Sequence, residues 1–230
     1  MAALIESNVN HLKETLVHMW QLIIAQMEKA RQTVITGDKN LIPEIKFNEK
    51  RVDAFELKLD MDCENTLMLK NPVAVDLRFV VSALKINYNL ERIGDYAHGI
   101  AKIMDKLNTA IPESVLEQTH LLEMFYTAQT MLQEAYDAFE TMDRNKVKSL
   151  FETDKKLDRY DKESNAIIAG IIDGKPSLST ESVLDILLIM KKLERTGDHV
   201  LNIAEELVFY FDADTIKHSK LDKKDSLPII

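Results

Sequence analysis

The apolar positions of the chain recur every three and four residues, which is the spacing of an amphipathic helix. Between residues 12 and 34 this row consists of Leu12, Leu16, Met19, Ile23, Met27, Ala30 and Val34. No segment of the sequence alternates apolar and polar residues over the length of a strand. The pattern therefore predicts an all-α protein.

Glycine and proline residues divide the helical pattern into six segments. The first predicted helix spans about residues 4–36 and ends at Gly37–Asp38. The second runs from this break to about 70, where Asn71–Pro72 ends it, and the third continues to about 107. The fourth spans about 113–142. The last two span about 146–172 and 180–210. Three helices per half with short connections predict two tandem three-helix bundles related by internal duplication. The predicted domains are a first repeat at 1–110, a second repeat at 111–212, and a flexible tail at 213–230.

A twelve-residue phrase occurs twice, 103 residues apart. It reads LERIGDYAHGIA at 90–101 and LERTGDHVLNIA at 193–204, and seven positions are identical. Each copy holds a glycine, Gly94 or Gly197, inside a predicted helix, where glycine costs about 1 kcal/mol relative to alanine. We therefore expect a neighbouring helix or a ligand to come close beside the aspartate that follows each glycine.

Acidic residues form a row along the second predicted helix of each half. The spacing is four, three and four in Glu49, Asp53, Glu56 and Asp60, and it recurs 105 residues later in Asp154, Asp158, Asp161 and Asn165. This spacing places each row on one face of its helix. The repeated phrases add four more acidic residues: Glu91, Asp95, Glu194 and Asp198. These four fall beside the apolar stripe of their helices, so we expect them at the surface and not in the core.

Like charges four residues apart on a helix repel by about 0.2 to 0.5 kcal/mol per pair, a cost that solubility alone does not require. If the second and third helices of each half are neighbours, their acidic rows converge on one strip. Converging carboxylates suit divalent or trivalent cations. The sequence thus predicts two metal patches: Glu49, Asp53, Glu91 and Asp95 in the first half, and Asp154, Asp158, Glu194 and Asp198 in the second.

Alternatives to metal binding stay open at this point. The acidic rows could be ordinary solvated faces, and Arg92 and Arg195 could neutralise neighbouring carboxylates without a metal. His98, three residues after Asp95, could supply a nitrogen ligand to the first patch, and Asn202 could hold a ligand in place in the second.

Composition narrows the classes of function. The net charge of -9 repels nucleic acid and anionic lipid. Cys63 is the only cysteine, which rules out an intramolecular disulfide and a thiolate metal site. The apolar runs are too short to span a bilayer and the N-terminus lacks a signal-peptide pattern, so we expect a cytoplasmic protein without membrane insertion. No sequence motif of a phosphate-binding loop, nucleophile elbow or metalloprotease helix is present. This favours a non-enzymatic adaptor over a metal-dependent carboxylate-site enzyme, while a metal-free helical scaffold, which is also non-enzymatic, stays open.

The motifs resemble those of the PhoU family of phosphate-transport regulatory proteins. The resemblance rests on the paired L-E-R-x-G-D phrases, EKRVD at 49–53, DKKLD at 154–158 and NPVAVDLR at 71–78, with a weaker match in DTIKH at 214–218. It implies a six-helix fold and multinuclear iron or zinc clusters bound by the eight acidic residues of the two patches. It also implies negative regulation of the phosphate-starvation response and of phosphate uptake, through the ATPase of the phosphate ABC transporter and a sensor histidine kinase. We further expect a homodimer formed through one helix face. Gly99, where the family more often has asparagine, and His98 depart from the pattern, which leaves the ligands of the first patch open.

Overall fold

The structure is a computed structural model that describes residues 2–70, 72, 74–107, 109–175 and 177–212, so the predicted tail and the DTIKH segment lie outside the described residues. Within these ranges the chain is helical and contains no strand, which confirms the all-α prediction. The elements are α1 (Ala2–Thr36), the 3₁₀ helix η1 (Lys39–Leu41), α2 (Ile42–Lys70), α3 (Ala74–Leu107), α4 (Glu113–Gln118), α5 (Leu121–Thr141), α6 (Arg144–Asp173) and α7 (Thr180–Asp212).

The helix predicted at 113–142 is two helices, so the described residues form seven α-helices and not six. The backbone of His120 has a φ of 52°, which is left-handed and ends the helical path. Immediately before it, the Thr119 hydroxyl donates a hydrogen bond of 2.7 Å to the carbonyl oxygen of Val115 at the end of α4. The prediction was wrong here because neither glycine nor proline marks the break.

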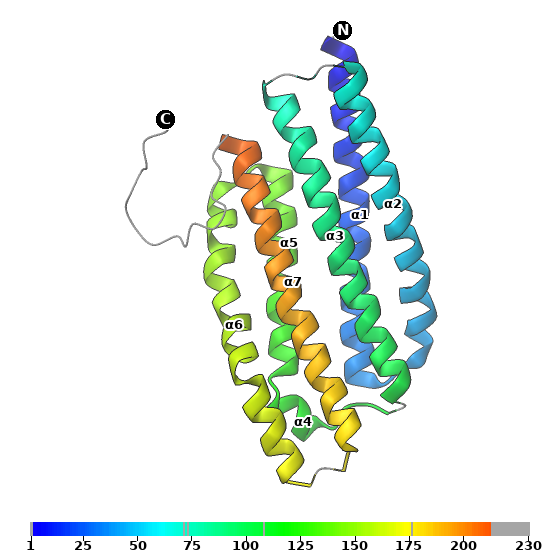
Figure 1. Cartoon of the computed structure of the whole chain (residues 1–230), viewed down its shortest axis with the longest axis vertical. Helices are drawn as coiled ribbons and strands as arrows, with labels where there is room; N and C mark the ends of the chain where they lie inside the picture. The colour runs from blue at the N-terminus through cyan, green and yellow to red at the C-terminus, as the bar shows by residue number, and fades with distance from the viewer. Residues whose placement is uncertain (1, 71, 73, 108, 176, 213–230) are drawn as a thin grey trace.

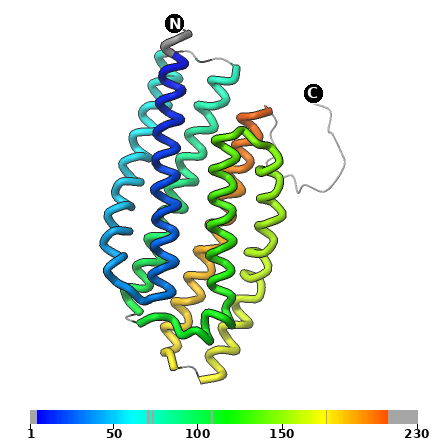
Figure 2. Tube along the Cα trace, turned by 180° about the vertical axis from the view of Figure 1, so that it is seen from behind, coloured from blue at the N-terminus to red at the C-terminus, as the bar shows by residue number. Residues whose placement is uncertain are grey.

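Two three-helix bundles lie side by side, one built from α1, α2 and α3 and the other from α5, α6 and α7 (Figure 1). Helices α3 and α7 contact each other on one side of the molecule, and α1 contacts α5 on the opposite side (Figure 2). Helices α2 and α6 lie at the two outer edges. The limits of the repeats at 110 and 212 stay a prediction.

The core is formed by the apolar rows that the sequence indicates. All seven residues of the first row are at most 1% exposed, and burial of a large aliphatic side chain stabilises the fold by about 1.5 to 3 kcal/mol. Trp20 extends this core between the bundles, because its indole Nε1 donates to the carbonyl oxygen of Leu132 at 3.3 Å and its ring packs on Phe139. None of the helices in the described ranges is long and apolar enough to cross a membrane.

The two repeats meet at equivalent residues where α3 crosses α7. Tyr96 and His199 hold the same position in the two repeated phrases, and Tyr96 Oη lies 3.2 Å from His199 Nε2. His199 Nδ1 lies 2.8 Å from Asn89 Oδ1, while the Lys192 ammonium lies over the Tyr96 ring at 5.5 Å. Asn89 and Lys192 are also equivalent positions, 103 residues apart. The repeats are therefore related by an approximate two-fold axis that passes between Tyr96 and His199.

Candidate metal centre

The acidic rows of α2 and α3 come together along the seam between these helices. Gln26 Nε2, on α1, donates to Glu49 Oε2 at 2.6 Å and to the carbonyl oxygen of Gly94 at 3.0 Å. A Cβ atom on Gly94 would lie 3.2 Å from Val52 Cγ1 and 3.6 Å from Glu49 Oε2. The glycine thus lets α2 approach α3 at the residue before Asp95, as the repeated phrase led us to expect.

The Glu49 carboxyl is buried among like charges. Its pKa is raised well above the ordinary value, first by burial and then by the Asp95 and Asp53 carboxyls, while the hydrogen bond from Gln26 acts in the opposite direction. Glu49 Oε1 makes no hydrogen bond within the described residues. His98 Nδ1 lies 3.8 Å from this oxygen. A buried carboxylate oxygen without a donor is an electrostatic cost that a cation can offset.

Arg92 contacts both acidic residues of the first phrase. Its Nε lies 3.2 Å from Glu91 Oε2 and its Nη1 lies 3.3 Å from Asp95 Oδ2. The contact with Glu91 is poorly aligned, because neither of its two atoms makes a hydrogen bond in the described part of the chain. Burial and the charge of Asp95 raise the pKa of Glu91 to about 7 even though Arg92 lowers it. The arginine therefore compensates the first patch only partly.

The acidic rows of α6 and α7 converge in the same way. Burial raises the pKa of Asp154 to about 7, with further contributions from Asp158, Asp198 and Glu194. The pKa of Glu194 is also raised to about 7, by burial and then by Asp198. A Cβ atom on Gly197 would lie 2.7 Å from Asp154 Oδ1, so this glycine leaves room for the carboxylate of the neighbouring helix.

The two patches differ in the basic side chains that form ion pairs with their carboxylates. Arg195, the counterpart of Arg92, forms no ion pair among the residues that the structure describes. In the second patch Lys162 Nζ lies 3.8 Å from Asp158 Oδ2, and beside the patch Lys191 Nζ lies 2.6 Å from Asp161 Oδ1. The salt-bridge alternative therefore applies to the first patch, through Arg92, more than to the second.

The expectation that the acidic residues of the repeated phrases lie at the surface is wrong for Glu91, which is 9% exposed. Glu49 and Asp154, on the facing helices, are 5% and 8% exposed. Positions beside the apolar stripe become buried because each helix of a three-helix bundle has a neighbour on both sides. Asp53 and Asp198 remain exposed, so each patch extends from a buried carboxyl to the solvent.

The donors suit a hard cation, although they are not yet arranged around one. In the described ranges no group of three or more His, Cys, Asp or Glu side chains is close enough together to hold a metal ion. Oxygens of Glu49 and Glu91 without a hydrogen bond in the described residues, together with the raised pKa values, are expected of buried carboxyls whose mutual repulsion is only partly compensated. Carboxylate oxygens of this kind suit hard cations in general, and glutamates also hold iron or manganese in helical-bundle proteins. The side chains would have to draw closer around the ion.

Sequence reasoning did not find two buried amides that hold the acidic row of α2, one at Glu49 in the first patch and one farther along the helix at Asp60. Gln26 is fully buried within the apolar face of α1, and this break in the apolar row was the only signal in the sequence. Asn87 Nδ2 donates to Asp60 Oδ1 at 2.9 Å and to the carbonyl oxygen of Glu56 at 2.9 Å. Gln26 thus fixes the Glu49 carboxylate relative to α1, and Asn87 fixes the Asp60 carboxylate and the Glu56 backbone relative to α3.

The departure at Gly99 has a structural explanation. A Cβ atom there would lie 2.6 Å from Lys192 Nζ, because the lysine crosses from α7 onto α3 at this point. Asn202, the counterpart of Gly99, donates instead to Asn89 Oδ1 at 3.2 Å. Gly99 and Asn202 therefore belong to the contact between the bundles, and neither hydrogen-bonds a patch carboxylate in the described residues.

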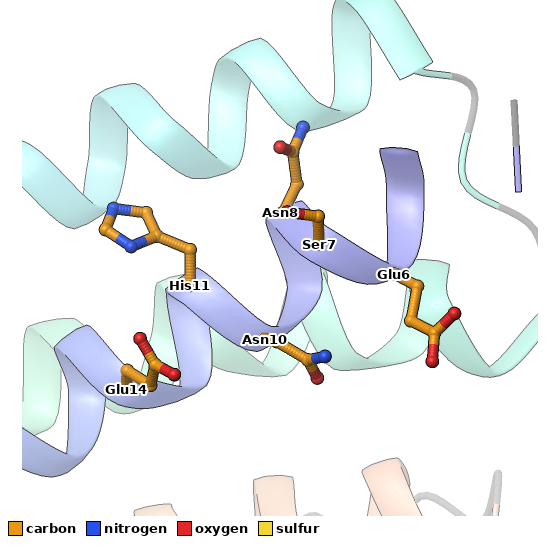
Figure 3. Close-up of a pocket in the computed structure, with 6 residues that line it drawn as sticks. All are labelled: Glu6, Ser7, Asn8, Asn10, His11 and Glu14. Carbon is orange, nitrogen blue, oxygen red and sulfur yellow. The ribbon is translucent and has the colours of Figure 1, made fainter. Parts of the chain in front are cut away.

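Concave surface elsewhere does not coincide with the patches. A hollow of about 610 Å³ lies along the N-terminal turns of α1 and is lined by Glu6, Ser7, Asn8, Asn10, His11 and Glu14. Figure 3 shows that these side chains point in different directions and do not converge on one point. None of the eight predicted site residues lines it.

Comparison with known proteins identifies the family. A family model described as "PhoU domain" matches residues 16–104 and again residues 121–207. The chain belongs to the PhoU family. The two PhoU matches correspond to the two three-helix repeats, and they confirm the resemblance seen in the motifs.

PhoU relatives cover nearly the whole chain. A phosphate-specific transport system accessory protein PhoU homolog of Pseudomonas aeruginosa is 28% identical over 220 residues, which is 94% of this chain and 89% of the relative. The homolog of Caulobacter vibrioides is 30% identical and covers 92% of both chains. The crystal structure of PhoU from Pseudomonas aeruginosa has a TM-score of 0.84 at 28% identity, covering 91% of this chain and 99% of that one. The phosphate transport system regulatory protein PhoU from Streptococcus pneumoniae has a TM-score of 0.80 at 27% identity, with 92% and 98% covered.

Proposed function

We propose that this PhoU-family chain is a metal-binding regulatory adaptor of phosphate homeostasis. It restrains the phosphate-starvation response and high-affinity phosphate uptake through contacts with the phosphate ABC transporter and a sensor histidine kinase. The observation that carries this proposal is the alignment of 94% of the chain with a relative named as an accessory protein of a phosphate-specific transport system. The helical bundle and the two carboxylate patches support a binding role.

In this proposal each patch binds an iron or zinc cluster. The first cluster is held by Glu49, Asp53, Glu91 and Asp95, and the second by Asp154, Asp158, Glu194 and Asp198. The bound metal supplies positive charge where burial and mutual repulsion now raise the pKa values of the carboxyls. A cation bound in the second patch would join α6 to α7, because carboxylates of both helices bind it. A cation in the first patch would join α2 to α3 in the same way. Metal occupancy would then fix the outer helices against the α3–α7 pair that joins the bundles.

A metal-free scaffold is the second candidate, and a specific contact favours it. Arg92 reaches both Glu91 and Asp95, so part of the charge in the first patch is already neutralised by protein. The two candidates differ in one measurable quantity, the metal content of protein purified without chelators. Stoichiometric iron or zinc supports the adaptor with clusters, and protein free of metal supports the scaffold.

The experiment measures metal content and phosphate-starvation signalling in the same variants. The variant is Glu91→Gln with Asp95→Asn, and the control is Glu113→Gln with Glu117→Gln, an exposed pair on α4 with the same spacing outside the patches. We expect the patch variant to lose metal by elemental analysis and to switch on a phosphate-starvation reporter in phosphate-rich medium. The control should leave both unchanged. A patch variant that lacks metal but represses the reporter normally would refute the regulatory role of the metal.

A further inference from the structure

The outward side of α2 carries a row of large apolar side chains in solvent. Phe47, Leu57, Met61 and Met68 are 62%, 64%, 63% and 67% exposed, and we call these four residues the α2 outer stripe. Helix α2 lies at the edge of the molecule, where it packs on α1 and α3 and has no helix on its far side among the described residues (Figure 1). Contiguous exposed apolar surface of this kind marks interaction sites in soluble proteins.

The internal duplication shows that the fold does not require this stripe. The positions 105 residues later on α6 are also exposed, and they hold Glu152, Lys162, Ala166 and Asp173. Helix α6 has the same place in its bundle as α2, at the opposite outer edge (Figure 1). The polar residues of α6 are those expected of a solvated face. The apolar residues of α2 therefore serve something specific to the first repeat.

The spacing of the stripe fits a partner helix. Phe47, Ala54, Met61 and Met68 are seven residues apart, and the intervening positions on the same side of α2 hold Lys50, Leu57 and Glu64. A seven-residue apolar repeat is the seam along which two helices wind around each other. The stripe extends over three such repeats, or about 32 Å of helix at about 1.5 Å per residue.

Charge defines the kind of helix that fits. Exposed Arg51 and Lys58 border the stripe on one edge, and Asp53 and Asp60 flank its other edge. Exposed Lys50 lies within the stripe, three residues after Phe47, and Lys58 Nζ lies 3.0 Å from Asp62 Oδ2. Lys50 and Arg51 form no ion pair within the described ranges. In a chain with a net charge of -9, this basic edge is an exception that attracts an acidic partner.

We propose that the α2 outer stripe docks an amphipathic helix of a partner protein, with apolar residues in heptad spacing and acidic residues where it meets Lys50, Arg51 and Lys58. An antiparallel second copy of the chain fits less well, because it would set each basic edge against itself. An anionic membrane surface fits less well because it would meet Asp53 and Asp60. The inference deepens the adaptor role proposed above and rests on that role for its biological meaning.

The test uses a synthetic helical peptide as the probe. It carries Leu at heptad positions a and d, Glu along one edge and Gln along the other, and a twin peptide carries Lys in place of Glu. The stripe variant takes its residues from α6: Phe47→Glu, Leu57→Lys, Met61→Ala and Met68→Asp. The control replaces two exposed leucines of α7, Leu184→Ala and Leu188→Ala. Fluorescence anisotropy of the labelled peptides measures binding, and circular dichroism checks that each variant is folded.

We expect the Glu peptide to bind the wild type and the control at least tenfold more tightly than the stripe variant, and more weakly as salt rises. A charge variant, Lys50→Glu with Arg51→Glu, should instead prefer the Lys peptide, and it leaves the apolar stripe unchanged if the fourfold variant does not fold. Equal binding to wild type and stripe variant would overturn the proposal. So would a wild-type dimer that the stripe variant dissociates, or stripe-dependent binding to phosphatidylglycerol vesicles without peptide preference. These results do not depend on metal content, so they separate this inference from the metal-dependent adaptor.

Discussion

Replacement of Gly197 by alanine tests whether the close approach of α6 to α7 requires a glycine at this position of the repeated phrase. A Cβ atom at this position would lie 2.6 Å from Leu157 Cδ1 and 2.7 Å from Asp154 Oδ1, both closer than atoms approach without rearrangement. Gly170, inside α6, is the matched control, because a Cβ atom there would have no neighbour within 4 Å. Both variants make the same chemical change inside a helix.

The two replacements separate helix propensity from packing. Each gains up to about 1 kcal/mol because alanine is the better helix former. Only in Gly197→Ala does overpacking also lower the free energy of unfolding, by about 1 to 3 kcal/mol. We therefore expect Gly170→Ala to raise the free energy of unfolding by up to about 1 kcal/mol, and Gly197→Ala to lie about 1 to 3 kcal/mol below it.

The measurement is denaturant unfolding of both variants and the wild type after chelator treatment, followed by thermal unfolding. For a chain of this size the difference corresponds to about 2 to 12 °C in Tm. The displaced Asp154 should also lower metal content in Gly197→Ala protein but not in the control. Equal stability of the two variants would show that α6 does not approach α7 as closely as the structure indicates.

Three further predictions concern the titration of the patches and the contact between the bundles. Asp154→Asn should raise the free energy of unfolding of chelated protein at pH 8 by about 1 to 3 kcal/mol, because it removes a negative charge that burial and the neighbouring carboxylates disfavour and that solvent screens in part. The same variant should lower the metal content, and a loss of stability would contradict the reasoning. The raised pKa values of Glu91, Asp154 and Glu194 mean that the folded chain binds more protons than the unfolded chain between about pH 4 and 7. Their contribution to stability is present below this window and falls as pH rises through it, which denaturation at a series of pH values will show as a negative slope that Asp154→Asn makes shallower. Tyr96→Phe removes the hydrogen bond between Tyr96 Oη and His199 Nε2 and should cost about 1 kcal/mol by chemical denaturation; an unchanged midpoint would mean that this bond does not join the repeats.

The helices could be predicted from the sequence because their signals are local. The apolar row of α1 and the glycine or proline at most of the breaks fix where helices run. The break at His120 was missed because no glycine or proline marks it, and the preference of histidine for a left-handed backbone is too weak to predict a break. Local patterns also predicted the acidic rows on their correct helices.

The sequence predicted which acidic residues belong to the candidate site, but not how deeply they are buried. A helical projection shows that Glu91 lies beside the apolar stripe, but whether that position is covered depends on how closely the next helix packs. That distance is set by Gly94 and Gly197 together with side chains from other helices, such as Gln26 on α1. A projection of one helix at a time contains no such information. The α2 outer stripe was likewise missed, because a single helix with apolar residues on two sides gives no clear face.

The contact between Tyr96 and His199 has a consequence for the history of the chain. If a single three-helix unit once paired with its own copy, the residue on the symmetry axis had to be the same on both sides, and it met itself. Fusion of two units into one gene released that constraint. A phenol and an imidazole now make an unlike pair of hydrogen-bonding groups at a place where two identical subunits could offer only like ones.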